Sequence, residues 1–445
     1  LEEALRYRVT VFAGTLSSAV IGEGDDAKEG AAQVQAYLSR GGVVVGEAVT
    51  APAARPLFGI DRVVESAARE EIRFEGDDPT LADLDQKEER VVALDDAAQE
   101  TKVGTVGYVT GDTASVLARF DDGTAALTRR EHEGGGVAYA VGARFLDLIT
   151  RHQEGARFSS KRRYVNSFET AADVWQLWLR GVYRTNVDGG VTIGTAPKGA
   201  PYAVVPTLSL NFSQGARFTP EYVNAAARLK APTTVFADTH YIDDWLDRAW
   251  FATDEFDAAA KAVAASGGEL ASHSVAHSPV FNRLAMGTGA ERYPDYRPFV
   301  ASRTKTTGAS IMGELRVSRE LLQGYQRSVH SFRSGYLLVP RGLPQAQDAA
   351  GYRFDSSSTQ GWVAGAFPFQ VPRLDGRGYA DVTTFPVVFE DAARGDLKGR
   401  ITRAAELMRR NGDNGAPSVL LYYPRDTDAL PDALPSWREV LSLPR

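Results

Sequence analysis

The sequence contains no cysteine, and this absence excludes several kinds of chemistry at once. Without cysteine the chain cannot form disulfides, zinc–thiolate centres or a cysteine nucleophile. The absence does not choose between an oxidising and a reducing compartment. Histidine is also scarce, with six among 445 residues, so two histidines close together deserve inspection.

Excess positive charge and long apolar runs are missing as well. The net charge of −7 argues against nucleic acid as the main partner and gives no basic patch for an acidic membrane. No apolar run approaches the roughly 18 residues of a membrane-spanning helix. The chain begins at Leu1 rather than Met. We therefore expect an extracellular or cell-surface protein whose signal peptide has been removed, with the cytoplasm as the alternative.

Length and composition predict two domains. A chain of 445 residues is longer than one ordinary hydrophobic core, and a Gly- and Pro-rich stretch interrupts it shortly before residue 201. We expect an α/β domain over residues 1–155, a connector over 156–200 and a second domain over 201–445. The connector places Trp175 and Trp178 at helical spacing, and we prefer a buried anchor helix there to a platform for stacking sugars.

The first domain reads as alternating strands and helices. Strand-like segments at 7–12 and 43–45 flank a helix-like segment at 26–39, a pattern typical of parallel pairing. The segments Tyr-Leu-x-x-Gly-Gly-Val-Val-Val (37–45) and Ala-Leu-Thr-Arg-Arg-Glu-His-Glu-Gly-Gly-Gly-Val-Ala-Tyr (126–139) resemble the glutamine-amidotransferase-like domains. The resemblance implies a flavodoxin-like open sheet. An active amidotransferase needs a cysteine nucleophile, so we expect a non-catalytic domain that is structural, binds a protein partner or contacts sugar.

The second domain has strand-like segments that alternate with helix-like ones. The first strand ends before Asn211, the second before Asp238 and the third before His273. Such alternation implies a parallel barrel, and barrel enzymes place their catalytic residues at the carboxyl ends of the strands. A long insertion at 278–310, rich in aromatic and charged residues, is expected to be functional or lid-like.

Two of the six histidines, His273 and His277, are four residues apart in Gly-Glu-Leu-Ala-Ser-His-Ser-Val-Ala-His. On a helical turn this spacing places both on one face, close enough to share a metal ion. Spacing alone leaves open a pair of hydrogen-bonded histidines on an irregular turn. The segment resembles the metal-binding motif of the polysaccharide deacetylases (the NodB-homology, carbohydrate esterase family 4 group). The resemblance implies a distorted (β/α)7 barrel and a divalent metal, with zinc as the first choice.

The first motif of that family is Thr-Phe-Asp-Asp-Gly, whose first Asp is the general base and whose second binds metal. The corresponding stretch, Asn-Phe-Ser-Gln-Gly, places Ser213 and Gln214 at these positions. Neither side chain is an anionic ligand or a base near neutral pH. Asp238, at the next strand end, is our candidate for the missing carboxylate. It would form a two-histidine, one-carboxylate metal face with His273 and His277 and act in catalysis, the alternative being a turn or capping residue.

The other motifs of that family match this sequence with substitutions. Arg333-Ser334-Gly335-Tyr336 corresponds to Arg-x-Pro-Tyr, which in the family forms a groove wall and orients the catalytic carboxylate. Tyr423 stands where the family has a histidine acid, so it is expected to donate a hydrogen bond to an oxyanion. The substrate contacts that we expect are Asn211, Gln214, Asp355 and Trp362. For Asp355 the alternative is the capping of a turn.

These features together predict a metal-dependent deacetylase of an extracellular N-acetylated amino-sugar polysaccharide, with an exopolysaccharide as the preferred polymer. The alternative is a catalytically inert carbohydrate-binding protein on a deacetylase fold, which the replaced motif residues favour. A third interpretation is a scaffold that acts through a protein partner on the first domain.

Overall fold

The computed structural model describes residues 3–17, 21–66, 69–94, 104–150, 166–168, 170, 172–191, 196, 200, 202–359, 365–373, 377–391, 396–425 and 432–443. The chain divides into two compact units. The first comprises Leu1–Arg151 and Thr170–Ile193, and the second comprises His152–Glu169 and Gly194–Arg445. None of the described helices has the length and apolarity that a membrane crossing requires.

The first unit is built on a nine-stranded sheet. Its strands are β1 (Val9–Phe12), β2 (Val43–Glu47), β3 (Ile60–Ser66), β4 (Glu71–Phe74), β5 (Val91–Ala93), β6 (Thr105–Thr110), β7 (Ser115–Phe120), β8 (Ala125–Glu131) and β9 (Val137–Val141). The helices described in this unit are α2 (Gly24–Leu38), α3 (Phe145–Thr150) and α4 (Asp173–Asn186), with short 3-10 turns η1 (Ala4–Arg6), η2 (Arg55–Phe58), η3 (Pro79–Leu81) and η4 (Lys87–Arg90). The main strand order is β1-β2-β9-β8-β7-β4-β5, while β6 pairs with β3 and β8.

Only part of this sheet is parallel. The strands β1, β2 and β9 are parallel, as expected for the first two, and α2 supplies the crossover between β1 and β2. All pairings among the strands β3 to β8 are antiparallel, as is the pairing of β8 with β9. The turn at 121–123 joins β7 and β8 in a hairpin. Parallel neighbours need a long crossover, whereas short turns join antiparallel strands. The flavodoxin-like, amidotransferase-like sheet is therefore not confirmed.

Helix α4 lies in the segment that we expected to connect two domains, and it packs within the first unit. Its Trp175 and Trp178 side chains are completely buried. The Trp175 ring stacks on Phe145 with ring centroids 5.4 Å apart, and Trp178 meets the same ring edge-on at 5.8 Å. The two tryptophans are thus part of the hydrophobic core and present no platform for a sugar.

The second unit contains another nine-stranded sheet, in the order β17-β18-β16-β15-β12-β11-β10-β20-β19. These strands are β10 (Val204–Leu210), β11 (Thr234–Ala237), β12 (Glu269–Ser272), β15 (Ser331–Phe332), β16 (Phe354–Asp355), β17 (Phe369–Pro372), β18 (Tyr379–Thr384), β19 (Val387–Glu390) and β20 (Ser418–Tyr422). The helices are α5 (Ser213–Arg228), α6 (Asp254–Ala265), α7 (Ile311–Leu322), α8 (Leu343–Ala350), α9 (Leu397–Asp413) and α10 (Ala433–Ser442), with the turns η8 (Phe281–Arg283) and η9 (Gly335–Leu337). A hairpin of β13 (Phe299–Ser302) and β14 (Lys305–Thr307) lies in the 278–310 insertion.

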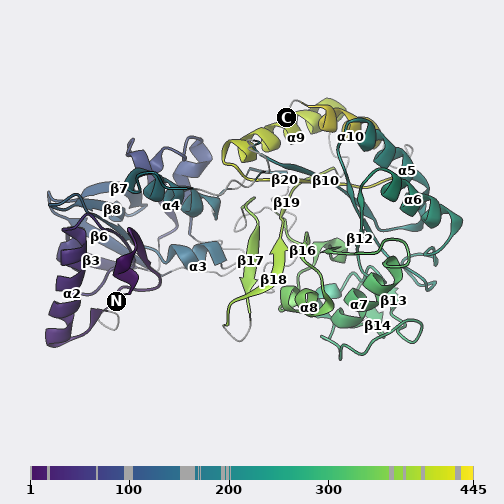
Figure 1. Ribbon diagram of the computed structural model, residues 1–445, viewed down its shortest axis with the longest axis horizontal. Coiled ribbons are helices and arrows are strands. Elements are labelled where there is room, and N and C mark those ends of the chain that lie inside the picture. The colour runs from purple at the N-terminus through teal and green to yellow at the C-terminus, as the bar shows by residue number, and fades with distance from the viewer. Residues whose placement is uncertain are drawn as a thin grey trace. The chain divides into compact units, whose positions relative to one another are not determined.

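The second sheet is parallel except at β17, and it curls round. The chain that leaves β16 forms a parallel bridge from Thr359 to Val387 of β19, with a 2.8 Å hydrogen bond from the Val387 amide to the Ser358 carbonyl. This bridge joins β16 to β19 and closes a ring through β20, β10, β11, β12 and β15. The unit is a mixed α/β fold with a curled sheet, consistent with a deacetylase-like fold (Figure 1).

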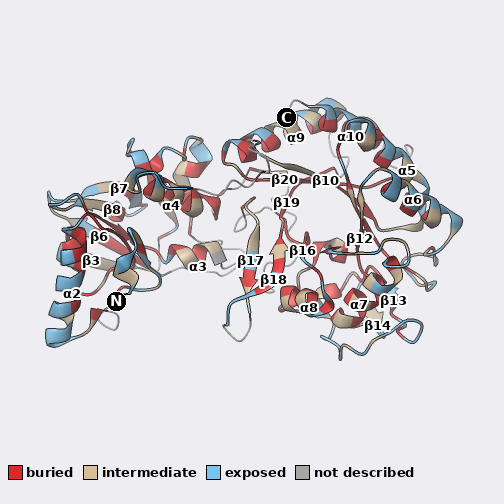
Figure 2. Cartoon of the chain, in the orientation of Figure 1, coloured by how far each residue is buried: buried red, intermediate tan, exposed pale blue. Residues whose placement is uncertain are grey.

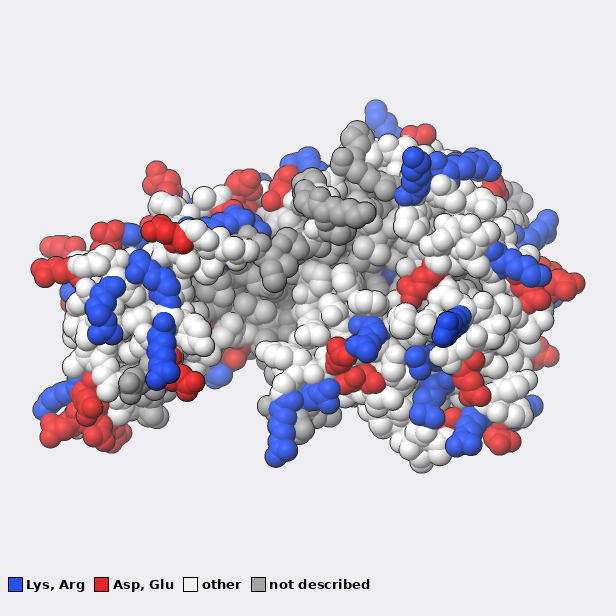
Figure 3. All heavy atoms as spheres, in the orientation of Figure 1, with Lys and Arg blue, Asp and Glu red and all other residues white. Residues whose placement is uncertain are grey.

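Apolar strands and the helices outside them make the core of the second unit. All five residues of β20 are buried, and so are the last five of β10, because these central strands are covered on both faces. Figure 1 shows α5, α9 and α10 along the outside of β10 and β20, and Figure 2 shows the burial concentrated on the strands. Basic and acidic side chains are interspersed on the face of the units that Figure 3 shows.

Candidate functional site

Polar and aromatic side chains meet at the carboxyl ends of the parallel strands, where they line a cavity of about 200 Å³. Asn211 follows β10, His273 follows β12, Arg333 follows β15 and Tyr423 follows β20. The lining residues are Ser209, Asn211, Phe212, His273, His277, Arg333, Tyr336, Leu337, Glu390, Leu421, Tyr423 and Arg425. The expected residues that the structure brings together are therefore Asn211, His273, His277, Arg333, Tyr336 and Tyr423.

The strand register and a backbone carbonyl fix the His273 ring. The amide of His273 donates to the Ala237 carbonyl at 3.0 Å, which continues the pairing of β12 with β11. The ring Nδ1 lies 2.7 Å from the carbonyl oxygen of Arg333. A carbonyl only accepts hydrogen bonds, so Nδ1 carries the proton and, in the neutral ring, Nε2 carries the lone pair. This is the arrangement that orients histidines which ligate metals.

A buried carboxylate from α7 holds the loop that carries His277. The Glu314 carboxylate accepts the amides of Val275 and Ala276 at 2.8 and 2.9 Å, and the hydroxyl of Tyr296 at 2.8 Å. Burial raises the pKa of Glu314, and the hydrogen bonds offset part of this rise. Our sequence reasoning missed Glu314. The available signal was a glutamate on the apolar face of a helix, between Ile311 and Leu315.

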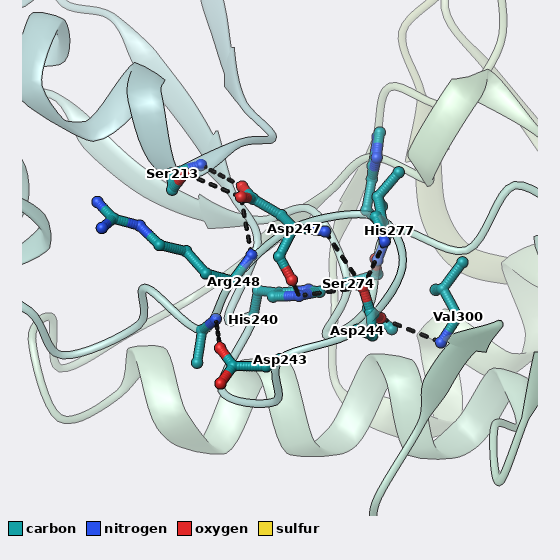
Figure 4. Close-up of polar contacts among 12 residues, drawn as sticks. Ser213, His240, Asp243, Asp244, Asp247, Arg248, Ser274, His277 and Val300 are labelled. Atoms are coloured by element: carbon teal, nitrogen blue, oxygen red, sulfur yellow. Dashed lines mark hydrogen bonds and ion pairs between the residues drawn. The ribbon is translucent and has the colours of Figure 1, made fainter. Parts of the chain in front are cut away.

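The His273–His277 loop has an uncommon backbone conformation. Ser274 and His277 have φ values of +89° and +47°, which few residues other than glycine adopt. The Ser274 hydroxyl accepts the His277 amide at 3.1 Å (Figure 4). The two imidazole centroids are 5.0 Å apart, and His277 stacks on Tyr336 at 4.5 Å. Conformations of this kind persist where the surroundings enforce them, often at functional sites.

Gly335 leaves the space that the His277 ring occupies. A Cβ atom built on Gly335 would lie 2.7 Å from Cδ2 of His277, closer than side-chain atoms pack. The position where the family has proline therefore has no room for a side chain in this chain.

Asp238 follows β11 as expected, but its carboxyl is buried and does not line the cavity. Oδ1 accepts the Ser274 hydroxyl at 3.3 Å, and Oδ2 has no hydrogen-bond partner among the residues that the structure describes. Burial raises the pKa of Asp238 well above its usual range, and the nearby charges of Glu314 and Asp247 add to the rise. Through its hydrogen bond with Ser274, this carboxyl holds the loop that carries the two histidines.

Neither Ser213 nor Gln214, the residues at the aspartate positions of the first motif, lines the cavity. Ser213 starts α5, and its amide and hydroxyl both donate to Asp247, at 2.6 and 2.9 Å (Figure 4). Gln214 is exposed on the same helix, outside the cavity. Asn211, two residues before Ser213, is the residue after β10 that lines the cavity. The residue at this strand end that lines the cavity is thus an amide.

Arg333 lies on the inner side of the curled sheet and bonds to other segments of the chain. Its buried guanidinium donates to Thr207 Oγ1 at 2.9 Å, and to Ser356 through Oγ at 2.8 Å and the carbonyl oxygen at 3.1 Å. The guanidinium carbon lies 4.1 Å from the ring centroid of Phe236. Arg333 therefore ties β15 to β10 and to the chain after β16, and it places a positive charge beside the cavity.

Tyr423 donates its hydroxyl to a carboxylate that our sequence reasoning missed. The acceptor is Oε1 of Glu390, 2.5 Å away, at the end of β19. Glu390 is 4% exposed. Its amide donates to Asn166 Oδ1 at 2.7 Å, and Asn166 Nδ2 donates to its carbonyl at 2.8 Å. A single glutamate that ends an apolar strand gave no recognisable motif.

One expected substrate contact, Asp355, lies in another part of the second unit. Asp355 is buried, and its Oδ1 accepts the Gln347 amide and the Ser357 hydroxyl, each at 2.6 Å. It lines a separate cavity of about 220 Å³ within the second unit. Burial raises the pKa of Asp355, and these hydrogen bonds oppose the rise. Asp355 has the bonds of a turn-capping residue, the alternative that we considered. Trp362 lies outside the described residues.

The site offers two imidazoles to a metal ion. Among the described residues, no three or more His, Cys, Asp or Glu side chains are grouped so that they could hold one. Asp238, His273 and His277 are thus not brought together as a three-ligand set. His273, His277 and Asn211 line the same cavity, and imidazole nitrogens and an amide oxygen are atoms of the kind that can bind a divalent ion.

Comparison with known proteins identifies part of this unit. Residues 204–354, about a third of the chain, match the family model described as polysaccharide deacetylase. The second unit therefore contains a polysaccharide deacetylase domain. No curated protein matches the chain.

Three solved structures show the range of similarity. A Mycobacterium smegmatis protein classed as a polysaccharide deacetylase is 14% identical over 57% of this chain and 89% of its own, with a TM-score of 0.41. Agd3, described as a novel carbohydrate deacetylase, is 11% identical over 94% of this chain and 71% of its own, with a TM-score of 0.33. A CE4 family pseudoenzyme from Bacillus anthracis is 12% identical over 54% of this chain and 63% of its own, with a TM-score of 0.31.

Proposed function

We propose that the second unit removes the acetyl group from an N-acetylated amino sugar of a polysaccharide. The observation that carries the proposal is the pair His273 and His277 in a cavity at the strand ends of a polysaccharide deacetylase domain. The cavity of about 200 Å³ has room for an acetamido group and a few waters, since a water takes about 30 Å³ in the liquid. An exopolysaccharide outside the cell is the substrate that we propose.

The residues that would hold a divalent metal, with zinc as the first choice, are His273 through Nε2, His277 and Asn211. When bound, such an ion polarises an amide carbonyl and lowers the pKa of its water. The chain itself orients the site: the Arg333 carbonyl sets the tautomer of His273, and Glu314 fixes the loop of His277. The Tyr336 ring, stacked on His277, forms a wall of the cavity against which a sugar can lie.

The test is acetate release from N-acetylated oligosaccharides, measured with metal content on the same preparations. We expect about one zinc per chain and acetate release in the parent protein, and the loss of both in the double variant His273→Ala, His277→Ala. His330→Ala is the matched control, because His330 is exposed and does not line the cavity. Acetate release that survives in the double variant would contradict the proposal.

One observation favours a second candidate, a carbohydrate-binding protein without hydrolysis. Ser213 and Gln214 stand where the family has aspartates, and Asn211, which lines the cavity, is an amide that cannot take up a proton or bring negative charge to a metal. A parent protein that binds the oligosaccharides but releases no acetate under metal-replete conditions would support this candidate.

A further inference from the structure

The cavity lacks the carboxylate that amide hydrolysis needs at the usual strand end. Asn211 occupies the end of β10, and Asp238 after β11 is bonded to Ser274 outside the cavity lining. Among the described residues that line the cavity, Glu390 is the only acidic one. It reaches the cavity from β19, a strand that carries none of the motifs described above.

We infer that Glu390 is the catalytic carboxylate of this site and that Tyr423 is its positioning residue. The inference rests on the proposed deacetylation and names the group that would transfer the proton in it.

The topology places Glu390 across the cavity from the histidines. In the ring closed by the bridge from Thr359 to Val387, β19 is three strands from β12 in one direction and four in the other. Strands separated in this way stand on opposite sides of the barrel, and both carboxyl ends point to the same rim. A substrate amide in the cavity would therefore lie between the Glu390 carboxylate and His273 with His277.

Short hydrogen bonds hold Glu390 in one conformation. The Tyr423 hydroxyl donates to Oε1 of Glu390 at 2.5 Å, at the short end of the range for hydroxyl hydrogen bonds. Asn166 fixes the backbone of Glu390 on both its amide and its carbonyl. The Arg425 side chain lines the same cavity and adds positive charge. These contacts meet the requirement that a catalytic group be held in place before the substrate arrives.

The proposed step balances without an added reactant. Glu390 takes a proton from water as the water oxygen bonds to the acetyl carbonyl carbon, giving a tetrahedral intermediate. The C–N bond then breaks, and Glu390 returns its proton to the leaving nitrogen. The products are acetic acid, which ionises to acetate, and the free amine of the sugar. Tyr423 keeps its proton throughout and acts by holding the carboxylate.

The experiment compares Glu390→Gln with its parent in acetate release and in oligosaccharide binding. The amide oxygen of Gln can still accept the Tyr423 hydroxyl, so the fold should be retained. We expect kcat to fall by about 100-fold to 10,000-fold, the usual share of general acid–base catalysis, with the affinity for the oligosaccharide within about threefold. Tyr423→Phe should lower kcat by about tenfold and leave KM unchanged, because the carboxylate remains but is less well held.

The control is Asp257→Asn, since Asp257 also accepts a tyrosine hydroxyl, that of Tyr325 at 2.6 Å, but does not line the cavity. It should keep the parent kcat. Formate added to Glu390→Ala should restore part of the activity if the carboxylate is chemical rather than structural. Glu390→Gln that keeps its kcat within threefold, while the parent releases acetate, would overturn the inference and leave the proposed function intact. A parent that releases no acetate under metal-replete conditions would overturn both.

Discussion

Gly335 is the position where a single added methyl group should act on the site with the least change elsewhere. A Cβ there would lie 2.7 Å from Cδ2 and 3.3 Å from Nε2 of His277. Ordinary carbon contacts begin near 3.5 Å, so the ring or the η9 backbone must move by about 0.8 Å. The ring has little freedom to move, because it stacks on Tyr336 at 4.5 Å and meets Phe212 edge-on at 5.7 Å.

We therefore expect Gly335→Ala to destabilise the second unit by about 1–3 kcal/mol, as overpacking does. For a unit of this size, that corresponds to a fall in Tm of roughly 2–12 °C. Activity should fall further than stability, by about 100-fold in kcat, since a misplacement near 1 Å at a catalytic group has an effect of that order.

The assay is acetate release alongside urea unfolding. Gly104→Ala is the matched control, because a Cβ at Gly104 meets no atom within 4 Å. If Gly335→Ala kept both the parent stability and the parent kcat, His277 would not be held in the position described, and the account of the cavity wall would be refuted.

Three further changes test other parts of the structure. Asn211→Asp should raise zinc affinity at least tenfold, about 1.4 kcal/mol, because it adds an anionic ligand beside the histidines. Isothermal titration measures this change. Gln214→Asp, on the exposed start of α5, should leave zinc affinity unchanged. Burial raises the pKa of Asp238, so the folded protein retains a proton that the unfolded chain releases above about pH 4. Because the unfolded state binds fewer protons there, this carboxyl lowers the free energy of unfolding increasingly as the pH rises towards its raised pKa. Asp238→Asn should therefore gain stability relative to its parent as the pH rises above about 4, measured by urea unfolding, and a gap that stays constant with pH would contradict this. Trp178→Ala should cost about 3–5 kcal/mol in the unfolding of the first unit, as for other buried aromatic residues, and a loss below 1 kcal/mol would mean that α4 is not part of its core.

The sequence was informative at several of the strand ends that form the cavity. A parallel strand can be recognised from a few apolar residues, and parallel carboxyl ends share one rim. This reasoning led to His273, Arg333 and Tyr423, which do line one cavity. The same reasoning placed Asp238 at a strand end. The sequence could not show on which side of the loop the Asp238 carboxyl lies, because that depends on its hydrogen bond with the Ser274 hydroxyl and on the φ of +89° at Ser274.

Other features could not be read from local sequence. Asn211 and Gln214 were both expected to contact substrate, but only Asn211 lines the cavity, because Gln214 already lies on the exposed face of α5. Glu390 lines the same cavity as the histidines, and the bridge from Thr359 to Val387 that closes the ring is a contact between segments distant in the sequence. In the first unit, the connections after β2 determine whether neighbouring strands pair parallel or antiparallel. The helix between β1 and β2 favours a parallel sheet, but the strands β3 to β8 pair antiparallel with one another.

The bonds of Glu314 bear on how this site could change in evolution. One carboxylate accepts Tyr296 of the 278–310 insertion and the amides beside His277. The insertion is further tied by the Tyr241 hydroxyl, which donates to the Tyr296 carbonyl. The insertion is therefore not a module that can be trimmed or exchanged between homologues at no cost. A new insertion with another substrate preference would have to supply its own hydroxyl to Glu314. Without that hydrogen bond the histidine loop would be held less firmly, whatever the new substrate.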